Sequence, residues 1–154
     1  MLLFGLGTLS TANDTTDEKA SVFQAVKAFD KSIKEDAFVY KMAALSSENS
    51  CLSPMVYLTA GSGYCGTGGC TVLMFGCAKE GYRLLGATSV AFPPVYIAKS
   101  VTSGYHDIKV HVKNKDLALL KFDGRHYPSN ASTAPKSTQT PDDTLLMDEG
   151  FVFP

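Results

Sequence analysis

The chain lacks tryptophan, has no run of basic residues, and contains no apolar stretch of membrane-spanning length. Its 154 residues carry 14 basic and 15 acidic side chains, which gives a formal net charge of −1. A nucleic-acid-binding surface needs clustered Lys and Arg, and a membrane-spanning helix needs about 20 consecutive apolar residues. We therefore expect no nucleic-acid partner and no membrane span. The apolar fraction of 45% suits a soluble globular protein of one domain.

Histidine is scarce, since only His106, His111 and His126 occur. Successive side chains of a strand point to opposite faces, so His106 and its neighbour Asp107 do not predict a catalytic triad. The chain also has no nucleophile elbow before a helix and no phosphate-binding loop. We expect no catalytic residue, no cofactor and no metal. A small hydrolase that uses Asp107 or Asp123 with His106 or His126 is the alternative.

Four cysteines are present, all between residues 51 and 77. Cys65 and Cys70 bracket a glycine-rich spacer, and glycine permits the positive backbone angles that a small ring needs, so we predict a disulfide between them. Cys51 and Cys77 are the second candidate pair. A structural zinc site usually contains a Cys-x2-Cys pair, which this spacing does not provide. Because disulfides persist in oxidising compartments, the cysteines indicate a periplasmic or secreted protein.

Residues 1–13 combine an apolar segment, Met1 to Leu9, with small residues that end at Ala12. This order is typical of the end of a secretory signal sequence, although the basic leading region is absent. We expect residues 1–13 to be a signal-peptide remnant or a disordered N-terminus.

One amphipathic helix is predicted over Asp17–Glu35. Thr15 and Glu18 have the spacing of a capping box. The apolar residues that fall on one helical face are Val22, Val26, Phe29 and Ile33.

Short apolar runs separated by turn residues then predict an antiparallel sheet of five or six strands. Met55–Ala60 and Thr71–Cys77 form a hairpin whose tip is the Cys-bracketed, Gly-rich loop. Pro93 and Pro94 cannot lie in the middle of a paired central strand, so we expect separate strands on the two sides of a bend there. Alternation of apolar and polar residues predicts a half-buried strand around Ile108.

The predicted fold class is α+β, with the N-terminal helix packed on the antiparallel sheet. A single α+β domain is expected over residues 14–128. Residues 129–154 begin with Ser, Thr, Ala and Pro and few apolar side chains, so they are predicted to be an irregular C-terminal strap. The last apolar residues of this strap are expected to dock on the sheet.

Two short motifs carry a resemblance to known proteins. The chain resembles a group of uncharacterised secreted bacterial domains that have a Gly-aromatic-x-Asp-aliphatic strand followed by a Phe-Asp-Gly-x-x-Tyr-Pro turn. Here the motifs are Gly104 to Ile108 and Phe122 to Pro128. A fainter similarity is to Ivy-type periplasmic lysozyme inhibitors, which place a cysteine-bracketed loop on an antiparallel sheet and insert it into the enzyme's cleft. The loop of those inhibitors carries His and Asp, which this chain lacks between its cysteines.

These features together predict a secreted or periplasmic binding protein that inhibits a cell-wall-degrading enzyme, as a lysozyme inhibitor or toxin-immunity protein. The partner would be a lysozyme or a peptidoglycan amidase, and the protein would be a monomer or weak dimer. A non-catalytic structural module of the envelope is a further alternative. We expect the Gly-rich tip and the turn at Ser103-Gly104 to lie at the same end of the sheet and to form one face. The expected partner-binding residues are Tyr64, Gly66, Thr67, Gly68, Gly69, Tyr105, His106 and Asp107.

Overall fold

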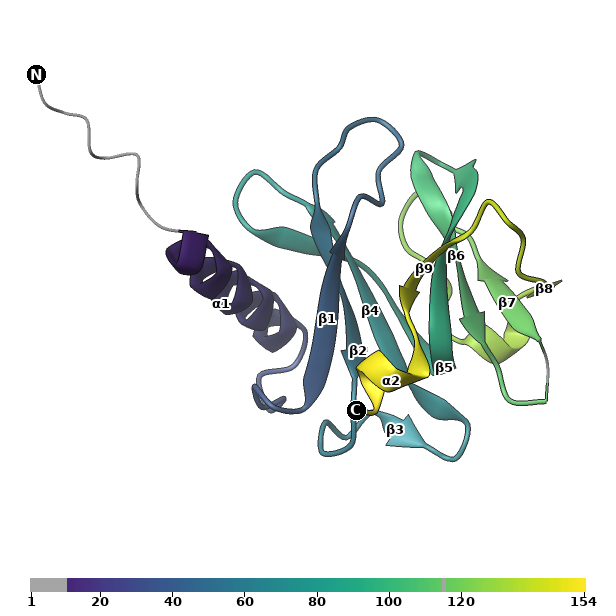
Figure 1. Ribbon diagram of the computed structural model, residues 1–154, viewed down its shortest axis with the longest axis horizontal. Helices are drawn as coiled ribbons and strands as arrows, with labels where there is room; N and C mark the ends of the chain where they lie inside the picture. Colours follow the sequence, from purple (N-terminus) through teal and green to yellow (C-terminus); the bar gives the residue numbers. More distant parts are fainter. Residues whose placement is uncertain (1–10, 115) are drawn as a thin grey trace, which may run out of the picture.

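The computed structural model describes residues 11–114 and 116–154, and this part of the chain is mostly antiparallel β-sheet with two α-helices (Figure 1). An N-terminal helix beside an antiparallel sheet is therefore confirmed, whereas the sheet has nine strands instead of five or six. The expectation for residues 1–13 falls mainly on residues 1–10, which lie outside the described residues. Residues 11–13 belong to the first helix.

Helix α1 (Thr11–Phe29) begins and ends about six residues earlier than predicted. Since Thr15 lies inside the helix, the predicted capping box does not mark its start. The helix ends where Asp30 accepts hydrogen bonds from the backbone N–H and the hydroxyl of Ser32, because such local bonds compete with helical ones. Ile33 is buried as expected, but it lies beyond the helix.

All nine strands pair antiparallel, in the order β1-β2-β4-β5-β6-β7-β8, with β3 beside β4 and β9 beside β5. The strands are β1 (Phe38–Ala43), β2 (Ser53–Leu58), β3 (Cys65–Gly66), β4 (Gly69–Cys77), β5 (Tyr82–Thr102), β6 (Tyr105–His111), β7 (Leu117–Leu120), β8 (Lys136–Ser137) and β9 (Thr144–Met147).

Strand β5 passes through both halves of the sheet. Its first half pairs with β4 up to Ala91, and its second half pairs with β6 from Phe92 and with β9 from Val95. The prediction of two separate strands is wrong, because one strand continues through Pro93 and Pro94. The two prolines nevertheless have no pairing partner on either neighbour, as the missing N–H of proline requires. We call β1–β4 with the first half of β5 the N-terminal half-sheet, and the remaining strands the C-terminal half-sheet.

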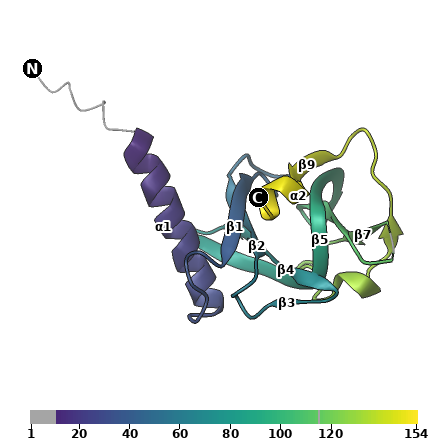
Figure 2. The same ribbon diagram turned by 60° about the horizontal axis from the view of Figure 1, so that its bottom comes forward.

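Two apolar clusters fill the molecule, one on each face of the N-terminal half-sheet. The outer cluster lies between α1 and the sheet, and the inner cluster lies between the two half-sheets. Strand β2 serves both, since Met55 and Tyr57 face the inner cluster while Val56 and Leu58 face the outer one. Covered on both faces, β2 is buried along its whole length. Figure 2 shows α1 standing beside this half-sheet.

Residues 129–154 are more regular than predicted. They contain a 3-10 turn, η2 (Ala131–Thr133), the strands β8 and β9, and the helix α2 (Glu149–Val152). The chain leaves β8 at one edge of the C-terminal half-sheet and reaches β9 at its other edge. Met147 and Val152 are buried in the inner cluster, so the expected docking of the last apolar residues is confirmed. Strands β8 and β9 are two of the strands by which the observed sheet exceeds the predicted five or six.

Candidate partner-binding surfaces

The tip of the predicted hairpin is a small cross-linked ribbon. Cys65 and Cys70 face each other across β3 and β4 and form a disulfide, and Gly66 pairs with Gly69. Gly66 and Thr67 are exposed, whereas Gly69 is buried against the backbone of β5. Figures 1 and 2 show β3 at the lower end of the sheet, away from the N-terminus of α1. The tip therefore presents Gly66 and Thr67, two exposed residues between its cysteines, on a constrained base.

Tyr64 precedes the tip but belongs to its support. Its hydroxyl donates a hydrogen bond of 2.6 Å to Asp30, and its ring lies 5.3 Å from that of Phe29. This bond lowers the pKa of the Asp30 carboxyl and raises the pKa of the Tyr64 phenol. Tyr64 thus fastens the tip to the end of α1.

Tyr105 also has a structural environment. Its ring packs 4.8 Å from the ring of Phe122, and its hydroxyl accepts a hydrogen bond of 3.1 Å from Arg83. Arg83 pairs with Gly76 near the end of β4 that is opposite to the tip.

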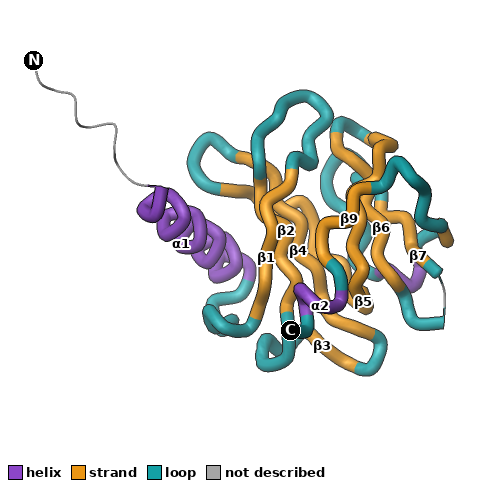
Figure 3. The backbone as a smooth tube through the Cα atoms, viewed as in Figure 1, coloured by secondary structure: helices purple, strands orange, loops and turns teal. Residues whose placement is uncertain are grey.

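The prediction that the tip and the Ser103-Gly104 turn form one face is wrong. The turn lies beside the β1–β2 loop, where the Ser47 N–H donates to the Gly104 carbonyl. Figure 3 shows these loops at the upper end and the tip at the lower end. The reason is the path of β5, which descends to Ala91, bends, and returns to the upper end. Tyr64 and Tyr105 consequently do not lie together.

His106 and Asp107 point to opposite faces of β6, as predicted, and both bind one bulge of β5. Between the pairs Ile97–Ile108 and Val101–His106, residues 98–100 of β5 lie opposite Asp107 alone. The carboxylate of Asp107, which is 2% exposed, accepts hydrogen bonds of 2.6 and 2.7 Å from Ser100 and Thr102. A residue buried in this way does not offer its carboxylate to a partner.

On the other face of β6, His106 Nδ1 lies 2.9 Å from the carbonyl oxygen of Ala98. A carbonyl only accepts, so Nδ1 carries the proton and Nε2 is the acceptor of the neutral ring. His106 lines a cleft of about 650 Å³ between β1 and β9. The other lining residues are Met42, Ala43, Ala44, Leu52, Ile97, Ala98, Lys99, Pro141, Asp142, Thr144 and Leu146.

Asp123 and His126 lie in one exposed turn. Asp123 accepts hydrogen bonds from the backbone N–H groups of Arg125 and His126, which lower the pKa of its carboxyl. His126 Nδ1 is 3.8 Å from an Asp123 oxygen, with both side chains more than half exposed. This is an Asx-type turn at the surface. The residues of the alternative hydrolase site are therefore not gathered in a cleft.

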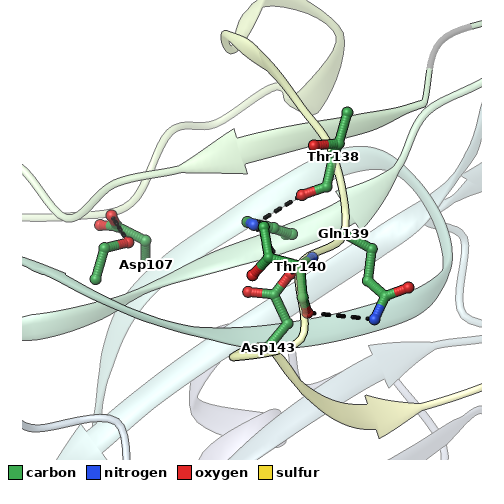
Figure 4. A network of polar contacts seen from close by, with 7 residues as sticks. Asp107, Thr138, Gln139, Thr140 and Asp143 are labelled. Carbon is green, nitrogen blue, oxygen red and sulfur yellow. Dashed lines mark hydrogen bonds and ion pairs between the residues drawn. The ribbon is translucent and has the colours of Figure 1, made fainter.

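The sequence did not indicate a buried ion pair between Lys109 and Asp143. The ammonium of Lys109 lies 2.9 Å from the carboxylate of Asp143 and donates a hydrogen bond of 2.8 Å to the carbonyl of Thr138. Figure 4 shows Thr138, Thr140 and Asp143 close together in this network. The two side chains are only 8% and 2% exposed. Burial alone would raise the pKa of Asp143, but the Thr140 amide and the Lys109 ammonium more than offset it and lower that pKa. The pair anchors the segment between β8 and β9 on β6.

Cys51 and Cys77 form the second disulfide, which links the start of β2 to the end of β4. Both predicted disulfides are therefore present, and they indicate an oxidising environment. Within the described residues, no group of three or more His, Cys, Asp or Glu side chains is arranged to hold a metal ion. Neither helix of that part of the chain has the length and apolar composition to cross a membrane.

Comparisons with family models, with curated proteins and with solved structures found no match. The two resemblances noted in the sequence stay predictions.

Proposed function

We propose that the protein is a periplasmic or secreted binding protein that inhibits a cell-wall-degrading enzyme, a lysozyme or a peptidoglycan amidase, and that the tip between Cys65 and Cys70 makes the central contact. The observation that carries this proposal is the constrained, exposed ribbon of β3. A preorganised loop loses little conformational entropy on binding, which favours affinity.

The charge and size of the tip limit how it can act. Gly66 and Thr67 bring no charged side chain, so the tip cannot neutralise catalytic carboxylates by an ion pair. It would act by filling an enzyme cleft with backbone groups. A Cβ added at Gly66 meets no atom within 4 Å, so substitution there changes the exposed surface without disturbing the fold. Of the partner-binding residues expected from the sequence, Gly66 and Thr67 remain as exposed contacts.

Inhibition assays with a panel of lysozymes and amidases test the proposal. We expect the wild-type protein to inhibit at least one enzyme as a monomer or weak dimer, as judged by size-exclusion chromatography. Gly66→Arg and Thr67→Arg should weaken inhibition by about tenfold or more, because a long side chain blocks entry of the tip. Ser50→Arg, in the exposed loop at the other end of the sheet, is the matched control and should inhibit normally.

Melting temperatures of all three variants should match that of the wild type. The proposal is wrong if no enzyme in the panel is inhibited or bound. It is also wrong if the tip variants inhibit as well as Ser50→Arg does.

A further inference from the structure

The cleft beside His106 lies between two strand edges that are open. Within the described residues, β1 pairs only with β2, and β9 pairs only with β5. Each strand therefore presents a row of backbone N–H and C=O groups on its second edge, and such edges are templates for another strand. The hydrogen-bonding groups of an extended peptide backbone repeat at the same interval as those of a strand edge, so an extended peptide fits such an edge.

Strand β1 and the C-terminal segment meet at one end of this seam, and at the other end the carbonyl of Leu45, just after β1, accepts a hydrogen bond from the His106 N–H. The Lys41 ammonium lies 4.5 Å from the ring centroid of Phe151, which closes the seam near the C-terminus. Beyond this contact the cleft opens along Met42 and Ala43 of β1 and the following Ala44, with Thr144 and Leu146 of β9 opposite. A volume of about 650 Å³ lies within the range of ligand-binding clefts.

The lining of the cleft specifies the chemistry of an occupant. Apolar side chains predominate, and Leu52 is 55% exposed at its border. Lys99 and Asp142 contribute one positive and one negative charge to the lining. Because these charges balance, the cleft is complementary to a peptide segment without net charge. His106 adds an acceptor at Nε2, which suits a backbone N–H or a hydroxyl.

We infer that this cleft binds an extended, uncharged peptide segment of a partner protein. The segment adds to the free edge at Met42 and Ala43 of β1 and the adjoining Ala44, and it places an apolar side chain between Leu52 and Leu146. Backbone hydrogen bonds supply affinity in this mode of recognition, and the pocket for alternate side chains supplies specificity. The site lies apart from the tip, so the inference does not depend on the proposed function.

A direct test uses the fluorescein-labelled peptide acetyl-Thr-Val-Thr-Leu-Thr-amide. Two control peptides have the same sequence but carry N-methyl groups on alternate backbone nitrogens, so that each control blocks the N–H groups on one edge of the extended peptide. Fluorescence anisotropy with the intact, oxidised protein should show saturable binding of the unmodified peptide at concentrations up to about 1 mM. One of the two methylated peptides should bind with an affinity at least about tenfold lower, because its methylated nitrogens cannot donate hydrogen bonds to the backbone of β1. Hydrogen exchange should slow at residues 41–44 when the unmodified peptide is present.

Leu52→Glu and its matched control Leu84→Glu locate the binding. Both leucines are exposed, but only Leu52 borders the cleft. Leu52→Glu should weaken binding about tenfold, and Leu84→Glu should leave it unchanged, with equal melting temperatures.

Four results would each overturn the inference. These are no binding of the unmodified peptide, equal binding of all three peptides, equal effects of the two glutamate variants, and a wild-type dimer that Leu52→Glu converts to monomer. The second result would indicate a compact apolar ligand, and the last would indicate a second copy of this chain in the cleft.

Discussion

His106 and Asp107 are consecutive in the sequence, yet they hold the same bulge of β5 from opposite faces of the sheet. His106 binds the carbonyl of Ala98, and Asp107 binds the hydroxyls of Ser100 and Thr102. A β-bulge leaves backbone groups without ladder partners, and here the His106 ring supplies a partner for the Ala98 carbonyl, while Asp107 fixes two side-chain hydroxyls of β5. The His-Asp pair, which in sequence suggests chemistry, is thereby accounted for by the geometry of β5.

Asp107→Ala should lower the free energy of unfolding by about 3 kcal/mol or more. Each hydrogen bond to a charged group contributes about 1.5 to 3 kcal/mol, and Asp107 accepts two while buried. Urea denaturation measures the change. Asp116→Ala, at an exposed position, is the control and should change stability by less than about 0.5 kcal/mol. Equal stability of the two variants would show that Asp107 does not hold the bulge.

The two disulfides should contribute unequally to stability. Cys51–Cys77 closes a sequence separation of 26 residues and Cys65–Cys70 one of 5. The chain-entropy model gives about 3.5 kcal/mol for the first and about 2 kcal/mol for the second. Denaturation of the two double Cys→Ser variants should show this order, and mass spectrometry of an unreduced digest should show both pairings. The reverse order of stability would contradict the model.

Removing one partner of the buried ion pair should cost more than removing both. Asp143→Ala leaves the Lys109 ammonium buried and unpaired, which typically costs about 3 to 5 kcal/mol. The double variant Lys109→Met with Asp143→Leu should recover most of this loss, because no charge is then buried. Urea denaturation of the wild type and both variants gives the comparison. A double variant as unstable as the single one would contradict the argument.

The pair also predicts a dependence of stability on pH. The pKa of Asp143 is lower in the folded protein than its usual value of 3.8. A depressed carboxyl pKa contributes stability above the unfolded pKa, and this contribution is lost as the pH falls through the folded pKa. Wild-type stability should therefore decline below about pH 4 more steeply than that of the double variant, as followed by urea denaturation at several pH values. Parallel declines would contradict this assignment.

The glycines of the tip should differ in their tolerance of a side chain. A Cβ at Gly69 would lie 2.6 Å from the carbonyl oxygen of Ala91, and its φ of +118° is unfavourable for any other residue. Gly69→Ala should therefore destabilise the protein by about 2 kcal/mol or more. Gly66→Ala is the matched control, since a Cβ there meets nothing within 4 Å. Thermal unfolding that affects both variants equally would contradict the placement of Gly69 against β5.

Local patterns predicted the features that depend on neighbouring residues. The hairpin of β2 and β4, the ribbon between the cysteines and both disulfides are present. The strand predicted around Ile108 is also present as β6, but it is not half-buried, because residues 107–110 are buried on both faces. Strand β1 begins with adjacent aromatic and β-branched residues, Phe38, Val39 and Tyr40, which favour β structure.

Features that depend on distant residues were not predictable from the same patterns. Lys109 alternates with apolar neighbours as an exposed residue does, but the segment at Asp143 covers it. Strands β8 and β9 are short, and their pairing is set by the crossing of that segment over β6. The continuation of β5 through two prolines placed Tyr105 at the end of the sheet opposite to the tip. Counting successive turns along the chain does not reveal that a single strand, β5, bends and returns to the end of the sheet from which it started.

The position of Met147 and Val152 in the inner cluster has a consequence for the order of folding. Both residues pack among side chains contributed by both half-sheets. The inner cluster is therefore incomplete until the segment that carries these residues has crossed the C-terminal half-sheet and paired with β5.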